Sequence, residues 1–338
     1  MFSDDAKGHE MDFSGIIGQR HVVDGLINAV RNERVGHAYI FSGPSGIGKK
    51  SVAKAFAGML LCKELVNGTR CGSCMPCQLF LNGSNPDFYV IGQGGSSIGI
   101  DEIRNMQSDV IVKPMYSKRK VYLIQNAENM TVQAQNCLLK TLEEPPGYAV
   151  LILTTSNYFS LMETIRSRSL RYNFIKNNFQ EVKDFLKEKI GNENKEIDFL
   201  ASYADGVIGK ALELAESTEF TDIRKKTFNM LDTLSKESKL VQIFDMYDLF
   251  EKNKDNVDII FDVMILFYRD VLACKKTGKE NMLINSDKKD MIISNASNYT
   301  TQKLIRNVEC IEEARKNIKQ NANYQLSIEV MLMRLQEE

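Results

Sequence analysis

The sequence lacks an excess of charge of either sign. Its 338 residues include 43 lysines and arginines against 44 aspartates and glutamates, and the net charge at pH 7 is −1. A protein that holds nucleic acid without sequence preference needs surplus positive charge, so this balance argues against that class for the chain alone. A local basic face stays open, because residues 118–120 (Lys-Arg-Lys) are either a solvated loop before a strand or a contact with DNA or a partner.

Long hydrophobic runs are missing as well. No uninterrupted apolar stretch approaches the roughly 18 residues of a membrane helix, and no apolar segment follows a basic start. Tandem repeats and low-complexity tracts are absent too. A hydrophobic content of 43% still suffices for two or three domains with real cores. We therefore expect a soluble, cytoplasmic protein that makes no contact with a membrane.

Cysteines are few, but four of the seven share the spacing C-x8-C-x2-C-x2-C. These four are Cys62, Cys71, Cys74 and Cys77. In an intracellular chain such thiols indicate metal rather than disulfides, and four thiolates suit tetrahedral Zn²⁺ with no open position for catalysis. The alternatives are unrelated buried thiols or an iron–sulfur cluster. The other three are predicted to be core thiols: Cys137, Cys274 and Cys310.

Strand and helix patterns alternate in the first half of the chain. Strands are predicted where short apolar runs are bounded by polar residues or glycine, in 38–41, 87–92, 118–126 and 148–156. Helical spacing follows the first strand in 50–62, and a second helix in 131–146 is stopped by Pro145 and Pro146. The last strand is almost wholly apolar, as in a parallel sheet covered on both faces. This order predicts a doubly wound parallel sheet with its ligand at the carboxyl ends of the strands.

From about residue 175 the strand signal disappears. A small helical unit is followed, beyond about residue 216, by longer helices. The segment 257–276 is apolar enough to be mostly buried. We interpret this part as a packing or oligomerisation domain.

The stretch GPSGIGKKS, residues 43–51, has the pattern of a phosphate-binding loop. Between a strand and a helix, its glycines turn backbone N–H groups toward phosphate and its lysine reaches the outer phosphates. The residues expected to bind phosphate are Gly43, Gly46, Gly48, Lys49 and Ser51. The position after the lysine normally holds Mg²⁺ through a hydroxyl, and here it is Lys50. A glycine-rich turn without a ligand is the alternative, and binding of ATP or ADP is left open.

A second departure follows the strand that ends at residue 124. An active ATPase of this kind has an Asp for Mg²⁺ there, usually followed by a Glu that orients water. This chain has Gln125 and Asn126, which supply neither charge nor a base. Glu128 is expected to point elsewhere. Two positions that handle Mg²⁺ are therefore lost together, which predicts weak or absent hydrolysis.

The order of these features resembles the AAA+ clamp-loader subunits of bacterial DNA polymerase III. The stretches that carry the resemblance span nearly the whole chain and are GHAYIFSGPSGIGKKSVAKAFA, the cysteine module, KVYLIQNAENMTVQAQNCLLKTLEEPP, LTTSN, IRSRS and NANYQLSIEVMLMRL. The resemblance implies an AAA+ P-loop domain in 1–173 with the zinc module at 62–77, a small helical lid domain in 174–215 and a helical collar in 216–338. Lys50 and Gln125-Asn126 fit a non-hydrolysing member of this family.

The resemblance also implies roles for other residues. SRS at 167–169 matches the family's Ser-Arg-Cys motif, with Ser169 in place of cysteine. Arg168 would act as an arginine finger toward ATP on a neighbouring tau/gamma subunit, with Arg166 as the second choice, and Thr155 matches a sensor position.

The function implied is that of a subunit in a hetero-pentamer with tau/gamma and delta subunits, which places the sliding clamp on primed DNA. The resemblance implies a subunit of a DNA-directed DNA polymerase holoenzyme that does not turn over ATP on its own. The alternatives are a hydrolysing tau/gamma-like subunit and an AAA+ adaptor unconnected to the clamp.

Overall fold

A computed structural model describes residues 13, 15–66, 68–94, 97–191, 196–235, 241–278 and 282–337. Residues 1–12 of the predicted first domain and 192–195 of the predicted lid lie outside the described residues. The described chain forms two compact units. The first runs to Val182 and includes Gly206–Gly209, and the second comprises Lys183–Asp205 and the residues from Lys210 onward. The predicted three-domain boundaries remain a prediction.

The first unit is built on a five-stranded sheet in which every pair of neighbouring strands is parallel. In spatial order the strands are β4 (Phe88–Ile91), β5 (Lys120–Ile124), β6 (Ala149–Thr155), β1 (Ala38–Ser42) and β7 (Leu170–Asn173). The predicted α/β parallel sheet and its first four strands are confirmed. The fifth strand, β7, was not predicted, because four residues of mixed polarity at the sheet edge carry no strand pattern.

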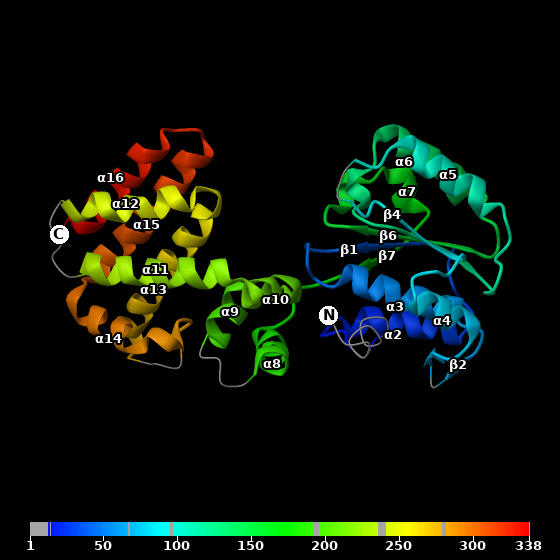
Figure 1. Ribbon diagram of the computed structural model, residues 1–338, viewed down its shortest axis with the longest axis horizontal. Coiled ribbons are helices and arrows are strands. Elements are labelled where there is room, and N and C mark those ends of the chain that lie inside the picture. The colour runs from blue at the N-terminus through cyan, green and yellow to red at the C-terminus, as the bar shows by residue number, and fades with distance from the viewer. Residues whose placement is uncertain are drawn as a thin grey trace. The chain divides into compact units, whose positions relative to one another are not determined.

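Helices cover both faces of this sheet (Figure 1). One layer contains α2 (Arg20–Arg31), α3 (Lys49–Leu61) and α4 (Met75–Leu81), and the other contains α5 (Ile100–Val110), α6 (Val132–Glu143) and α7 (Glu163–Ser167). The strands alternate between the two layers. Val150 and Ile152 of β6 pack with α3, whereas Leu151 and Leu153 pack with α5 and α6.

Local sequence explains where α6 begins and ends. The hydroxyl of Thr131 accepts a hydrogen bond from the N–H of Ala134 at 3.2 Å and caps the first turn. The two prolines at 145 and 146 follow the last turn and cannot extend it. The short helices η1 (Ala127–Asn129) and η2 (Tyr158–Ser160) follow β5 and β6 at the carboxyl edge of the sheet.

The described residues that follow β7 contain helices. They are α8 (Phe179–Ile190), α9 (Ile197–Tyr203), α10 (Ile208–Glu216), α11 (Thr218–Ser235), α12 (Val241–Lys252), η3 (Lys254–Asn256), α13 (Val257–Thr277), η5 (Ser286–Lys288), α14 (Lys289–Asn298), α15 (Thr301–Lys319) and α16 (Tyr324–Gln336). Helix α13, which was expected to be mostly buried, has 9 of its 21 residues buried, and it packs against α11, α14 and α15. In the described parts of the chain, no helix combines the length and apolar character needed to cross a lipid bilayer.

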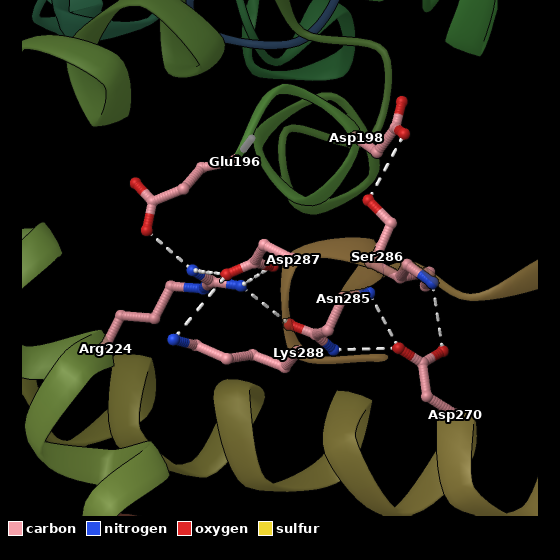
Figure 2. A network of polar contacts seen from close by, with 9 residues as sticks. Glu196, Asp198, Arg224, Asp270, Asn285, Ser286, Asp287 and Lys288 are labelled. Carbon is pink, nitrogen blue, oxygen red and sulfur yellow. Dashed lines mark hydrogen bonds and ion pairs between the residues drawn. The ribbon is translucent and has the colours of Figure 1, made fainter. Parts of the chain in front are cut away.

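A buried charge network joins elements of the second unit (Figure 2). Arg224 on α11 is 2% exposed and binds the Asp287 carboxylate through two hydrogen bonds, of 2.7 and 3.0 Å. Its Nη1 also donates to Glu196 at 2.7 Å, and its Nη2 donates to the Asn285 side chain at 3.1 Å. Asn285 in turn donates to the buried carboxylate of Asp270. The network therefore ties the start of α9 to α11, α13 and η5.

Candidate functional site

The phosphate-type loop lies between β1 and α3, where the sequence predicted it. Gly48 precedes α3 with a φ of 99°, a conformation that favours glycine. Gly43 lies so close to Phe174 that a Cβ added to it would stand 2.6 Å from the Phe174 carbonyl oxygen. The loop therefore needs glycine at both positions, for backbone conformation and for space.

Lys49 folds back onto this loop. Its ammonium donates to the carbonyl oxygens of Gly43 at 2.5 Å and Pro44 at 2.7 Å, and the residue is 7% exposed. Burial lowers the pKa of Lys49 to about 8, while the negative charge of Glu128 raises it and the positive charge of Lys50 lowers it. The lysine that would reach outer phosphates is thus bonded to the loop's own backbone.

A second segment of the chain lies against the same loop. The N–H of Gly209 donates to the carbonyl of Gly46 at 2.9 Å. A Cβ on Gly209 would stand 2.7 Å from that oxygen, so only glycine allows this approach. Gly46 and Gly209 are more than 160 residues apart in the sequence, so no local pattern predicts this contact.

The positions that would handle Mg²⁺ lie at the start of α3 and after β5. Ser51 is exposed on the first turn of α3, and Gln125 and Asn126 follow β5. The negative charge of Glu128 raises the pKa of Lys49. Its Oε1 accepts from the N–H of Ser156 at 3.0 Å and from the Ser156 hydroxyl at 2.6 Å. Burial raises the Glu128 pKa, but these hydrogen bonds outweigh it and the net pKa is lowered. Glu128 is therefore a carboxylate whose charge reaches the loop lysine, an effect that the sequence pattern does not indicate.

The four clustered cysteines come together around a short hairpin, β2 (Leu65–Val66) with β3 (Thr69–Arg70), and the start of α4. All four Sγ atoms lie within 4.8 Å of one another. The Sγ atoms of Cys62 and Cys74 are 4.0 Å apart, and two thiolates on one tetrahedral Zn²⁺ with bonds of ~2.3 Å would be ~3.8 Å apart. The cluster is therefore compatible with a structural zinc ion.

Backbone N–H groups support thiolates in this cluster. The N–H of Cys74 donates to Sγ of Cys71 at 3.3 Å, and this bond is the main reason that the Cys71 pKa falls to about 6. The N–H of Cys71 likewise donates to Sγ of Cys62 at 3.3 Å, although burial raises the Cys62 pKa. Burial also raises the pKa of Cys77. Bound metal would offset this cost, because it takes thiolates.

The cysteines outside the cluster lie at separate places in the fold. Cys310 is buried, whereas Cys137 and Cys274 are half-buried.

The basic residues at 118–120 differ in exposure. Lys120 is 3% exposed and donates to the carbonyl of Asp109, so its role is structural. Lys118 is exposed.

Arg168 follows the last residue of α7 and precedes β7. Its side chain is 38% exposed and lies 3.1 Å from the Glu143 carboxylate. Arg166 is more enclosed, since its guanidinium lies over the rings of Tyr158 and Phe159 at 5.2 and 5.4 Å. Of these two arginines, Arg168 is the more accessible to a neighbouring molecule.

Strand direction separates Arg168 from the loop of its own chain. β7 and β1 are parallel, with Leu170 opposite Tyr39. From Tyr39 to Gly43 the chain advances four residues, or about 13 Å, and Arg168 precedes Leu170 on the other side. The phosphate-type loop lies at the carboxyl edge of the sheet and Arg168 at the amino edge. Arg168 therefore does not serve this chain's own loop.

Together these features define a class: a P-loop α/β domain with a helical C-terminal part, an incomplete set of Mg²⁺ ligands and a four-cysteine module. Sequence profiles described as "DNA polymerase III, delta subunit" and "DNA polymerase III, delta subunit, C terminal" match residues 18–178 and 218–337. The chain is 30% identical to DNA polymerase III subunit delta' of Bacillus subtilis over 321 residues, which cover 94% of this chain and 96% of that protein. It belongs to the family of DNA polymerase III clamp-loader subunits.

Other relatives in this family are named as tau or gamma subunits of DNA polymerase III. DNA polymerase III subunit tau of Bacillus subtilis is also 30% identical, over 96% of this chain, and the chain spans 61% of the length of that protein. Among solved structures, a DNA polymerase III gamma subunit-related protein from Thermotoga maritima matches 93% of this chain and 98% of its own, with 20% identity and a TM-score of 0.45.

Proposed function

We propose that this chain is the delta-prime-type, non-hydrolysing subunit of the DNA polymerase III clamp loader. It would help place the sliding clamp on primed DNA during replication, in the cytoplasm, within a hetero-pentamer of tau/gamma and delta subunits. The near-complete coverage of the delta' relative supports this assignment over the tau relative, which the chain covers only in part.

The surroundings of Lys49 carry the proposal. Transfer of the outer phosphoryl group needs Mg²⁺ held by a hydroxyl and an acid, and a residue that orients water. Here Lys50 is exposed where the hydroxyl belongs, and amides follow β5. Lys49 itself is bonded to the carbonyls of its own loop. The phosphate-binding residues Gly43 to Ser51 are therefore proposed to be a retained scaffold, and occupancy by ATP or ADP would be non-productive.

Arg168 is proposed to act in trans. It lies at the sheet edge opposite to the loop of its own chain, and it is accessible. A guanidinium supplied by a neighbour stabilises the charge that spreads over the transferred phosphoryl oxygens. The four cysteines of the module are proposed to hold one structural Zn²⁺, which would fix the hairpin against α4. The lid (174–215) and collar (216–338) boundaries belong to this proposal as well.

The test compares the chain alone with the reconstituted loader. We expect negligible Mg²⁺-dependent ATPase from the isolated chain. In the complex, Arg168→Ala is expected to lower clamp- and DNA-stimulated ATPase several-fold, since one of several sites loses a group that is worth roughly 10³–10⁵ at a single site. Arg34→Ala, at an exposed arginine before β1, is the matched control and should leave the rate unchanged. An unchanged rate in the Arg168→Ala complex would remove the finger role.

A hydrolysing subunit is the second candidate, and the position of Glu128 favours it. Its carboxylate acts on Lys49 and has one oxygen that is buried without a hydrogen-bond partner. If this oxygen held Mg²⁺ through water, the isolated chain would hydrolyse ATP, and both Lys49→Ala and Glu128→Gln would abolish the activity. Absence of turnover in the isolated chain excludes this candidate.

A further inference from the structure

We propose that Glu143 is a positioning residue for Arg168, which holds the guanidinium in the orientation that enters the neighbouring subunit's site. This inference rests on the proposed function of Arg168. Glu143 is the last residue of α6, and Arg168 follows α7, so the two residues come from different helical segments.

The contacts of the guanidinium leave part of it free. Nη2 of Arg168 lies 3.1 Å from Oε1 of Glu143. Nη1 donates to the carbonyl oxygen of Thr164 at 3.2 Å and to the hydroxyl of Ser167 at 3.4 Å. Three of the five N–H groups are therefore used, and no further acceptor is found within the described residues. The remaining two, on Nε and Nη2, are available to phosphoryl oxygens.

Glu143 contributes little to the stability of the chain. Its side chain and that of Arg168 are 51% and 38% exposed, and ion pairs of this kind are weak because water screens them. Glu143 is also the last residue of α6, where the helix dipole disfavours a carboxylate. The guanidinium offsets this unfavourable placement. The pair is therefore better explained by its effect on the orientation of Arg168 than by its effect on folding.

The helix that carries Glu143 also fixes the start of α7. The Gln135 side chain on α6 is 4% exposed; it accepts from the N–H of Met162 at 2.8 Å and donates to the carbonyl of Ser160 at 3.3 Å. α6 thus holds α7 at its beginning through Gln135 and holds the arginine after its end through Glu143. A buried hydrogen-bonded amide makes the frame rigid, so that the ion pair sets the direction of the arginine relative to a fixed helix.

Orienting an arginine that acts in trans before it enters the neighbouring site should change the rate by a measurable amount. A free arginine side chain populates many rotamers, and it loses this freedom when it enters a neighbouring site. An ion pair that selects one rotamer beforehand removes part of that loss. From the cost of fixing one long side chain, the expected effect of losing the pair is a rate lower by about three- to tenfold at the affected site.

The experiment measures clamp- and DNA-stimulated ATPase of the reconstituted loader with the unchanged chain, Glu143→Gln, Arg168→Ala and the double variant. Glu144→Gln is the matched control, because this neighbour is also exposed and no contact with Arg168 is found for it. Size-exclusion chromatography verifies that each complex assembles. We expect Glu143→Gln to lower kcat of the complex by less than Arg168→Ala does, with little change in KM for ATP, because the loss of about three- to tenfold falls on one of several sites and Arg168 acts on the transition state. Glu143→Asp should recover part of the rate.

The double variant decides whether Glu143 acts through Arg168. We expect Glu143→Gln to have no further effect once Arg168 is alanine. A full-strength effect in that background overturns the inference, and so does a higher rate in Glu143→Gln alone, which would mean that the pair sequesters the arginine. An unchanged rate in Arg168→Ala defeats the proposed finger itself. A lower rate in Arg168→Ala with an unchanged rate in Glu143→Gln defeats only the role of Glu143.

Discussion

Replacing Arg224 by methionine is expected to destabilise the second unit strongly. The guanidinium is 2% exposed and binds both oxygens of Asp287, whose side chain is 8% exposed (Figure 2). Removing one partner of a buried pair leaves an uncompensated charge and costs about 3–5 kcal/mol in free energy of unfolding. Lys288 lies 3.9 Å from Asp287 and offsets part of that charge, which places the expected cost near 3 kcal/mol.

The assay is differential scanning calorimetry, with hydrogen exchange to identify the unit that unfolds. For a unit of this size, each kcal/mol lost in free energy of unfolding lowers the melting temperature by about 2–4 °C. The melting temperature of the transition that exposes the amides of α11 and α13 should therefore fall by about 6–12 °C. Lys226→Met is the control on the same helix. Its partner is Asp222, both side chains are more than half exposed, and the expected change is below about 0.5 kcal/mol.

A second substitution tests the cause. In the Arg224→Met background, Asp287→Asn removes the uncompensated charge and should recover part of the lost melting temperature. The reasoning fails if Arg224→Met melts no lower than Lys226→Met, or if Asp287→Asn lowers the melting temperature further in that background.

Two further predictions concern the metal module and the loop. The purified chain should contain about one Zn²⁺ per molecule by mass spectrometry of metals, and Cys77→Ser should lose the metal and lower the melting temperature of the first unit, whereas Cys137→Ser should keep the metal. Burial lowers the folded-state pKa of Lys49 from 10.5 to about 8, so the unfolded chain holds the proton over a range where the folded chain has released it. The contribution of Lys49 to the free energy of unfolding should therefore rise with pH from about 8 to about 10.5, measured by urea unfolding against Lys49→Met.

Each of these has a result that contradicts it. A metal content that is the same in Cys77→Ser as in the unchanged chain would remove the zinc proposal. For Lys49, a difference between the two proteins that stays constant across the alkaline range would mean that the ammonium is not destabilised by burial.

The sequence alone determined the features that depend on neighbouring residues. Apolar runs separated by helical patterns predicted four parallel strands, and the C-x2-C steps and the glycine-rich turn marked a metal module and a phosphate-type loop. The sequence also showed that Gln125 and Asn126 replace the expected acidic pair, because a motif with fixed spacing shows which position has changed. These signals are local, so they survive without knowledge of the fold.

Tertiary structure alone decided which distant residues meet. β7 became a strand because β1 offers it a parallel edge, and that pairing places Arg168 at the edge opposite to the loop. Gly209 lies against Gly46, Glu143 contacts Arg168, and the charge of Glu128 raises the pKa of Lys49, yet nothing in the spacing of these residues indicates their proximity. The reason is physical: helix and strand periodicity record which face of an element is buried, whereas contacts between elements depend on how a whole sheet and its layers pack.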